Sequence, residues 1–406
     1  RLSYGSLGNQ QVGYYDYMQV INSGSQINYS FGNDQKITGA SVSAPNSSDL
    51  TWEKVLTYNA GLDIALFNNK LSFSADSYIR DTKDMLMAGK DLPAVYGASS
   101  PKANAANLRT KGYELSASWN DSFNVLSSPL HYGITLGFGD SKTKITKYDN
   151  PNMTIGTYYK GLELGSIWGF VADGFFKTDE EAAKYPVDQT YLNSMINISV
   201  IDNGLHAGDI KFIDLDGDGK ITPTTSAKEL KDYRIIGNSL PRWTYSGIID
   251  LDWKGVGISA FLQGVVRQHW YPASETGLFW GPYARPYQSF IPSDFLSKVW
   301  TPENPNSYFP RPRGYVAFAG DGGSRELTRP NTMYLQNAGY LRLKNLTVSY
   351  TLPNRWMHFF SMEKVRIYFS GENLFTISGL DTKYIDPEMA AAGYSTSSNA
   401  GHRDAN

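Results

Sequence analysis

The amino-acid sequence predicts an all-β fold, an antiparallel transmembrane β-barrel with long extracellular loops. Three observations predict it. Apolar and polar side chains alternate with a period of two over segments of about ten residues. This pattern is typical of strands with one apolar face and one face toward water. The connections between these segments are alternately short and long. Tyrosine occurs 28 times and glycine 38 times among 406 residues, a composition typical of strands and turns.

The segments at the start of the chain show the pattern most clearly. Residues 1–8 already look like a strand, so we expect the chain to begin inside a structured region. Apolar side chains then occupy every second position of 58–66 and, apart from Ser77, of 71–79. Asn68 and Asn69 lie between these two runs and tolerate the positive φ angles of a tight turn. The two runs are therefore predicted to form a β-hairpin.

The same alternation predicts the later strands. They cover residues 113–119, 132–139, 245–253, 256–263, 341–350 and 365–375. A loop containing Pro129 separates the first two, and Lys254 and Gly255 form a turn between the next two. The phase of the alternation slips at Asn345, where a β-bulge is the simplest explanation.

The connections differ strongly in length. Short ones are expected at residues 68–69, 120–129, 254–255 and 352–364, and long ones at about 9–52, 81–109, 142–241, 271–338 and 376–406. Antiparallel strands send successive connections to opposite ends of a sheet. One end should therefore carry tight turns and the other the long loops, as in outer-membrane barrels.

A soluble two-sheet sandwich is the alternative to a barrel. The barrel is favoured because aromatic residues lie near the strand ends, where they would form interfacial girdles, and because segments of about ten residues suit a tilted membrane crossing. The aromatic residues are Tyr58, Phe67, Tyr113, Trp119, Trp253 and Tyr350. The face toward a wet lumen would carry Asp63, Asp76, Arg80, Glu114, Arg342, Lys344, Arg366 and Glu372.

The number of strands implies a larger barrel. The pattern contains about nine strands, whereas bacterial barrels close with an even number. An unpaired strand edge in hydrocarbon would leave a row of backbone groups without hydrogen bonds, at several kcal/mol each. We therefore expect further strands before residue 1 and after residue 406.

Composition and motifs argue against several other classes of protein. Lys and Arg number 37 against 39 Asp and Glu, which gives no basic excess for binding nucleic acid. Cysteine is absent and only five histidines occur, too dispersed to suggest a ligand set. The run Gly255-Val256-Gly257-Ile258-Ser259-Ala260 has the form of a dinucleotide fingerprint but lies inside a predicted strand. We therefore expect no enzyme.

Several separated stretches resemble the SusC-like TonB-dependent transporters of Bacteroidetes-type outer membranes. These stretches are LTWEK at 50–54, YNAGLD at 58–63, LFNNKL at 66–71, YIRDTKD at 78–84, RTKGYEL at 109–115, IWGFVADGFF at 167–176, GDI at 208–210, DLDGDG at 214–219, YLRLKN at 340–345 and ENLF at 372–375. Their order and spacing span almost the whole chain, which makes the resemblance specific.

The resemblance implies the C-terminal portion of a 22-stranded barrel. Residues 1–406 would be part of one barrel domain, residues 142–241 a long extracellular loop region, and an N-terminal plug and the last strand would lie outside this sequence. It also implies a multi-pass protein of the Gram-negative outer membrane that imports a large nutrient, a glycan or an oligopeptide. A SusD-like surface lipoprotein would form the lid and TonB would supply energy. The alternative is a secreted or surface calcium-stabilised β-protein, acting as a glycan-binding or adhesion module.

The Asp-rich run at 214–221 is the sharpest local motif. Asp214, Asp216 and Asp218 alternate around a glycine turn and can converge on one hard cation, with the carbonyl of Lys220 next in order. We expect structural Ca²⁺; magnesium and a metal-free solvated turn are the alternatives. The twelfth position, where an EF-hand has a bidentate acid, is Thr225. Asp209 or Glu229 could supply that oxygen.

Aromatic side chains in the long loops are candidates for contacts with a sugar or a peptide. They are Tyr158, Tyr159, Trp168, Trp270, Trp280, Tyr283 and Tyr287, and the arginines beside them are Arg285, Arg311, Arg313, Arg325 and Arg329. The predicted substrate-binding residues are Trp168, Trp280, Tyr283 and Arg285. The alternative is that these rings pack the loops against one another or against a lid protein.

Overall fold

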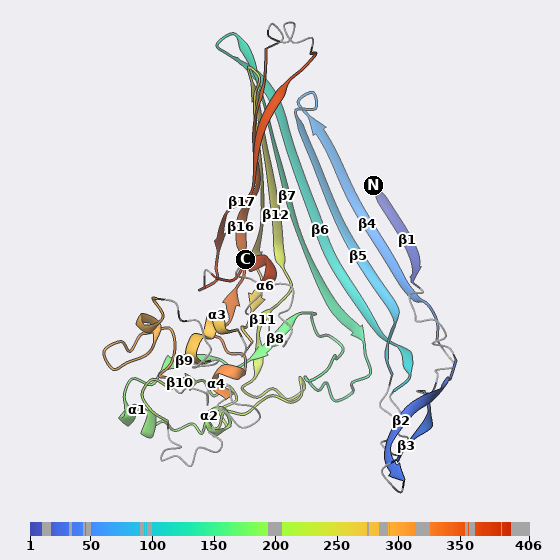
Figure 1. The fold of residues 1–406 in the computed structure, drawn as a ribbon, viewed down its shortest axis with the longest axis vertical. Helices are drawn as coiled ribbons and strands as arrows, with labels where there is room; N and C mark the ends of the chain where they lie inside the picture. The colour runs from blue at the N-terminus through green and yellow to red at the C-terminus, as the bar shows by residue number, and fades with distance from the viewer. Residues whose placement is uncertain are drawn as a thin grey trace. The chain divides into compact units, whose positions relative to one another are not determined.

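The computed structural model contains one large antiparallel sheet that accounts for all the predicted strands (Figure 1). It describes residues 1–9, 18–31, 35–43, 45, 50–89, 93, 95, 100–193, 205–273, 276–283, 291, 293–312, 325–353, 356, 362–382 and 384–390. The sheet has nine strands in chain order: β1 (Leu2–Asn9), β4 (Glu53–Leu66), β5 (Leu71–Ala88), β6 (Lys102–Val125), β7 (Ser128–Lys147), β12 (Arg242–Trp253), β13 (Val256–Arg267), β16 (Tyr340–Thr351) and β17 (Arg366–Ser378).

Three neighbouring strands are longer than the sequence predicts. β5, β6 and β7 have 18, 24 and 20 residues instead of about ten. The expected loop at 120–129 is therefore wrong, since only Leu126 and Ser127 separate β6 from β7 and both have positive φ angles. The extra length was missed because its residues are mostly polar on both faces and show no alternation.

The predicted turns at 68–69 and 254–255 and the predicted bulge are confirmed. Phe67, Asn68 and Asn69 have φ angles of 55°, 55° and 66°, and Lys254 and Gly255 have 50° and 86°. The register between β16 and β17 shifts between Leu343 and Asn345, as the phase slip predicts. The indole nitrogen of Trp253 donates to the carbonyl of Val125 at 3.3 Å, which brings two of the tight turns together.

One face of the sheet is apolar and uncovered. Ile134 pairs with Ile249, which pairs with Ala260, while Gly133, Asp250 and Ser259 form the next row on the opposite face. Leu136 is 55% exposed and Phe369 is 75% exposed. Within the described residues no second sheet covers these side chains, which argues against the sandwich. An apolar face of this extent is normally covered by a partner or by lipid.

The chain divides into two compact units. Unit 1 comprises residues 1–62, 76–113 and 141–163, and unit 2 comprises 63–75, 114–140 and 164–406. Unit 1 contains, besides its share of the large sheet, the hairpin of β2 (Ile21–Phe31) and β3 (Gln35–Val42). No helix in the described ranges is long and apolar enough to cross a membrane.

The long connections of unit 2 fold into small elements. The strands are β8 (Ser166–Gly169), β9 (Ala172–Phe175), β10 (Ile210–Phe212), β11 (Arg234–Asn238), β14 (His269–Trp270) and β15 (Gln336–Asn337). The helices are α1 (Asp179–Ala183), α2 (Thr190–Asn193), α3 (Gly277–Trp280), α4 (Arg325–Thr328) and α6 (Pro387–Ala390), with 3₁₀ turns η2 (Gly281–Tyr283) and η3 (Leu296–Lys298).

These elements share a hydrophobic core of their own, which we call the loop core. Its buried residues are Phe170, Phe175, Leu192, Ile210, Phe212, Ile221, Trp270, Phe279, Trp280, Tyr283, Phe295, Val299, Trp300, Phe309, Leu327, Tyr334, Ala338, Ile385 and Ala390. They come from segments more than 200 residues apart in sequence. The loops of unit 2 therefore pack together around one hydrophobic core and are not independent loops.

Candidate functional site

Two of the predicted substrate-binding rings lie inside the loop core. Trp280 is fully buried and Tyr283 nearly so. Trp280 packs edge-on against Phe279 and Tyr334, with ring centroids 4.7 Å and 5.1 Å apart, and its indole nitrogen donates to the carbonyl of Ala273 at 3.1 Å. The hydroxyl of Tyr283 donates to a backbone carbonyl, and burial raises its pKa. Neither ring offers a free face to a ligand.

The alternative interpretation, in which the loop aromatics pack against one another, therefore holds for Trp280 and Tyr283. A folded body of this size needs apolar side chains in its interior to exclude water. Their position in long, polar loops suggested exposure, but sequence alone does not tell which loop aromatics face one another. Trp270 and Tyr159 are buried as well.

Trp168 remains partly exposed. It lies on β8, opposite Ile235 of β11, and stacks on Tyr233 with ring centroids 6.2 Å apart and planes at 20°. Ile235 is exposed, so the two side chains form a small apolar surface on the β8–β11 pair. Arg285 and Tyr287 lie outside the described residues. In unit 1, Tyr158 is exposed and packs edge-on against Tyr148.

The three carboxylates of the Asp-rich run converge as predicted. One oxygen each of Asp214, Asp216 and Asp218 lies within 4.8 Å of the others. The Asp214 carboxylate accepts the amide hydrogens of Gly217 at 2.7 Å and Gly219 at 2.8 Å. The amide of Gly219 is the main cause of the lowered pKa of Asp214, so this group is ionised at neutral pH. Gly217 and Gly219 have φ angles of 77° and 82°, which is why glycine stands at both positions.

Two residues that the sequence did not single out support this loop. Asp232 is fully buried, and its carboxylate accepts the amide hydrogens of Leu215 and Thr222, both at 2.7 Å. Thr222 holds the ninth position of the run, and its hydroxyl oxygen is buried with no hydrogen-bond partner in the described part of the chain. The ninth position supplies a ligand, often through water, in EF-hand loops, so the spacing from Asp214 could have indicated Thr222.

The two acids proposed as the missing ligand do not complete the set. Asp209 is fully buried and bound by the guanidinium of Arg311, with its nearest contact at 2.5 Å, and by the amide of His206. Glu229 is exposed and does not belong to the converging group. The ammonium of Lys231 lies 3.5 Å from Asp218 and 4.0 Å from Asp216. The converging oxygens fit a hard cation, and Lys231 partly compensates their charge.

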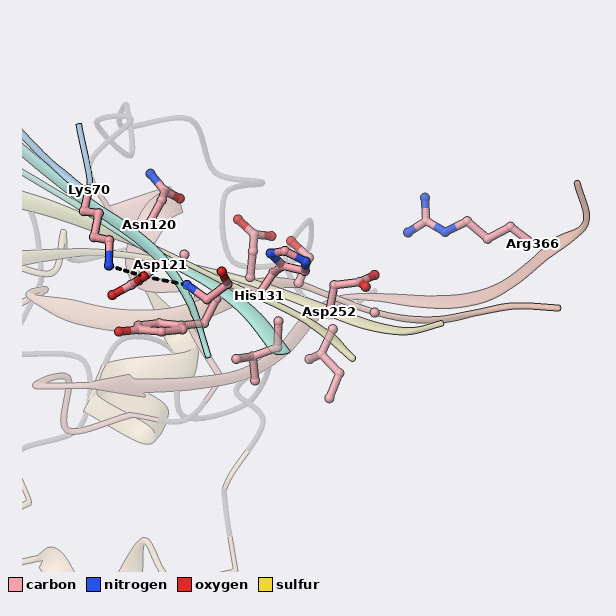
Figure 2. A pocket seen from close by; sticks show the side chains of 14 residues that line it. Lys70, Asn120, Asp121, His131, Asp252 and Arg366 are labelled. Carbon is pink, nitrogen blue, oxygen red and sulfur yellow. Dashed lines mark hydrogen bonds and ion pairs between the residues drawn. The ribbon is translucent and has the colours of Figure 1, made fainter. Parts of the chain in front are cut away.

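A polar pocket opens on the wet face of the sheet near the tight turns. Figure 2 shows this pocket, which has a volume of about 600 Å³ and is lined by strands β6, β7, β12, β13 and β17 and by the turn that precedes β5. The ammonium of Lys70 lies 2.7 Å from the carboxylate of Asp121. Asp250 and Asp252 lie on one face of β12, with Gly133 and Gly257 as their respective cross-strand neighbours.

The sequence showed only that Asp250 and Asp252 share a strand face, because the other lining residues come from distant strands. The small neighbours leave space beside the two carboxylates. His131 pairs with Asp252 in the register, and Arg366 donates to the hydroxyl of Ser349 at 2.9 Å. The pocket is a recess in the sheet that is lined by charged and polar side chains together with Tyr132, Leu251 and Ile258.

Comparison with known proteins gives one consistent result. The family model described as "TonB dependent receptor-like, beta-barrel" matches residues 6–374. The chain is 28% identical over 401 residues to the TonB-dependent receptor P3 of Formosa agariphila, covering 96% of this chain and 35% of that protein. It is 24% identical over 410 residues to the TonB-dependent receptor SusC of Bacteroides thetaiotaomicron, again covering 96% and 35%.

The solved structures show the same fold. The RagAB peptide importer in its open-open state superposes with a TM-score of 0.66 at 24% identity, over 95% of this chain and 37% of that one. The closed-closed state gives a TM-score of 0.61. The chain thus spans about a third of the length of the curated relatives it matches.

The match covers most of the chain and agrees with the antiparallel sheet and its uncovered apolar face. The predicted fold class, the resemblance and the outer-membrane location are thereby confirmed. The chain belongs to the TonB-dependent receptor-like β-barrel family of the bacterial outer membrane.

Proposed function

We propose that the protein containing this chain imports a large nutrient, a glycan or an oligopeptide, across the outer membrane with energy from TonB. The family match over residues 6–374 carries this proposal. The name of one similar protein, the RagAB peptide importer, supports the oligopeptide class. The resemblance to SusC-like transporters implies the glycan alternative. A charged sheet face with a pocket lined by Lys70, Asp121 and Asp250 suits passage of a polar solute through a water-filled lumen.

A SusD-like surface lipoprotein is the proposed lid partner. The tight turns gather at one end, so the loop core belongs to the strand ends away from them. A packed body at the loop end offers a firm surface for a lid, and partly exposed side chains such as Trp168 and Ile235 suit such a contact or a ligand. Trp168 and Arg285 remain the proposed substrate contacts. No covalent chemistry is proposed, since the family consists of receptors and transporters.

Deletion of the gene in the native bacterium tests the transport proposal. The deletion strain should lose growth on, and uptake of, one class among defined oligosaccharides and oligopeptides, and the full-length gene should restore both. Deletion of tonB should cause the same loss. The proposal is contradicted if the deletion strain takes up every compound as fast as its parent.

Purification of the full-length protein in detergent tests the partner and the contact residue. A SusD-like lipoprotein should co-purify in fixed ratio. Trp168→Ala should weaken binding of the imported compound roughly tenfold, the usual cost of losing an aromatic contact. Phe369→Ala is the matched control, because Phe369 is an exposed aromatic residue on β17 in the row of Val348. Equal affinities in both variants would rule out Trp168 as a contact.

Structural Ca²⁺ in the Asp-rich loop is a second proposal, carried by the convergence of three carboxylates and by the unpartnered buried hydroxyl of Thr222 in the described structure. Asp214, Asp216, Asp218, the carbonyl of Lys220 and Thr222 would hold the ion, which would supply charge compensation and rigidity. Titration of the full-length protein with CaCl₂ should show one site that Asp218→Asn weakens. Asp149→Asn, at an exposed acid elsewhere, should leave the affinity unchanged. Absence of any binding isotherm in the wild type would refute the proposal.

A further inference from the structure

A cluster of charged side chains fastens the loop core to the wet face of β16. We propose that Arg342 is a positioning residue for transport: it fixes the loop core to β16 through Asp386 and Glu388, and so sets the apparent affinity for the imported compound rather than the maximal rate. This inference rests on the proposed transport function. We call these three residues, with Tyr340 and Lys344, the β16 anchor.

Arg342 is the centre of the anchor. Its Nη2 donates to Asp386 at 2.6 Å and its Nη1 to Glu388 at 2.9 Å. The third guanidinium nitrogen, Nε, donates to the hydroxyl of Thr376 on β17 at 2.7 Å. One planar side chain thus joins two neighbouring strands to helix α6, which a lysine could not do because it lacks the fixed fork of donors.

Two further β16 side chains converge on the same acid. The ammonium of Lys344 lies 3.0 Å and 3.1 Å from the two carboxylate oxygens of Glu388, and the hydroxyl of Tyr340 donates to it at 3.0 Å. Strand alternation places all three β16 residues on one face, at positions 340, 342 and 344. Two cations therefore meet two carboxylates, and the cluster is close to neutral.

The burial of the anchor is graded. The side chain of Arg342 is only 6% exposed, whereas Glu388 is 28% and Asp386 41% exposed. A guanidinium this deeply buried needs its acid partners, because breaking a buried pair leaves an uncompensated charge. Removing either partner should therefore release the segment rather than leave it in place.

The other side of the same segment belongs to the loop core. Ile385 and Ala390 are buried in it, and the amide of Asp381 donates to the side chain of Gln336 at 3.1 Å. The carbonyl of Asp386 accepts the amide hydrogens of Met389 and Ala390, which shapes α6 between the two surfaces. Residues 384–390 thus hydrogen-bond to β16 on one side and pack into the loop core on the other.

The test compares uptake kinetics of full-length variants in the deletion strain. Arg342→Gln should raise the KM for uptake roughly tenfold while the maximal rate per copy changes less than twofold, the pattern of lost binding geometry. The KM of Arg342→Lys should lie between that of the wild type and that of Arg342→Gln. Arg109→Gln is the matched control, since Arg109 pairs with Asp81 at 2.6 Å on strands β6 and β5 with no contact to the loop core given by the described structure. Its KM should not change.

A cross-link separates positioning from charge. The chain has no cysteine, so Arg342→Cys with Glu388→Cys creates one reactive pair in it. Joining the pair with a short reducible bis-methanethiosulfonate linker should restore the wild-type KM, and reduction should raise the KM again. If Arg342→Gln lowers only the amount of protein or the maximal rate, or if the cross-link restores nothing, the inference is wrong.

Hydrogen–deuterium exchange keeps the anchor testable apart from transport. Peptides that contain residues 384–390 should exchange faster in Arg342→Gln than in the wild type, with no change in Arg109→Gln. Wild-type protein that imports no compound would refute the proposed function, and this measurement would still decide the anchor. Unchanged exchange in Arg342→Gln would overturn it.

Discussion

Single residues shape the Asp-rich loop through hydrogen bonds to its backbone, and one of them, Asp232, lies outside the motif. The alternation of Asp214, Asp216 and Asp218 predicted their convergence, because residues two apart on a tight glycine turn face the same side. The same reasoning from spacing could not identify Asp232 as a residue that supports the loop. It follows the last motif aspartate by 14 positions, and only the fold brings its carboxylate under the amides of Leu215 and Thr222.

We expect Asp232→Asn to loosen this loop. The amide keeps the size of the carboxylate but turns one buried acceptor into a donor that faces another donor, which costs about 1–3 kcal/mol. Hydrogen–deuterium exchange of peptides covering 214–224 in the full-length protein should rise accordingly. Asp294→Asn is the control, because Asp294 is an exposed acid paired with Lys298 at 2.8 Å. Equal protection of 214–224 in wild type and Asp232→Asn would contradict the expectation.

At the scale of elements, strand existence could be predicted but strand length could not. Alternation marks only the part of a strand whose two faces meet different surroundings. In β6, residues 113–119 show it, while the flanking residues are polar on both sides and extend the strand to Lys102 and Val125. The same limit applies to the loop aromatics Trp280 and Tyr283, whose burial depends on partners far away in sequence.

The hairpin turn between β12 and β13 gives a prediction at this scale. Gly255 has a φ angle of 86°, and a Cβ there would lie 2.6 Å from the carbonyl oxygen of Thr351. Gly255→Ala should therefore destabilise the folded barrel by about 1–3 kcal/mol through left-handed backbone strain and this clash. Urea unfolding of the full-length protein in lipid vesicles measures the effect.

Gly247→Ala is the matched control for the turn. Gly247 lies within β12 with an ordinary φ angle, and the nearest atom to an added Cβ is Cδ2 of Leu136 at 3.6 Å, a normal contact. Alanine there should be neutral or slightly stabilising because it restricts the unfolded chain. A loss in Gly247→Ala as large as that in Gly255→Ala would show that the turn conformation is not the cause.

At the scale of the whole molecule, the exposed apolar face of the large sheet determines which surroundings the folded chain needs. The rows of the sheet that contain Leu136, Ile249 and Phe369 are apolar and exposed, and only the opposite rows carry Asp250 and its polar neighbours. Apolar side chains in such number, uncovered within the described residues, mark a surface that a partner or lipid covers. In an outer-membrane β-barrel that cover is lipid. The sandwich alternative would have buried these rows between two sheets.

A lysine on the apolar row tests this surface directly. Leu136→Lys should place a charge against hydrocarbon and lower the free energy of unfolding of the full-length protein by up to about 2–4 kcal/mol, depending on depth. Ser246→Lys is the matched control. Ser246 lies on the opposite, polar face of β12, and its cross-strand partner on β7 is Gly137. Urea unfolding in lipid vesicles should show a clearly larger loss for Leu136→Lys. Equal losses for both would mean that the two faces do not differ in solvent, and the membrane orientation of the sheet would have to be abandoned.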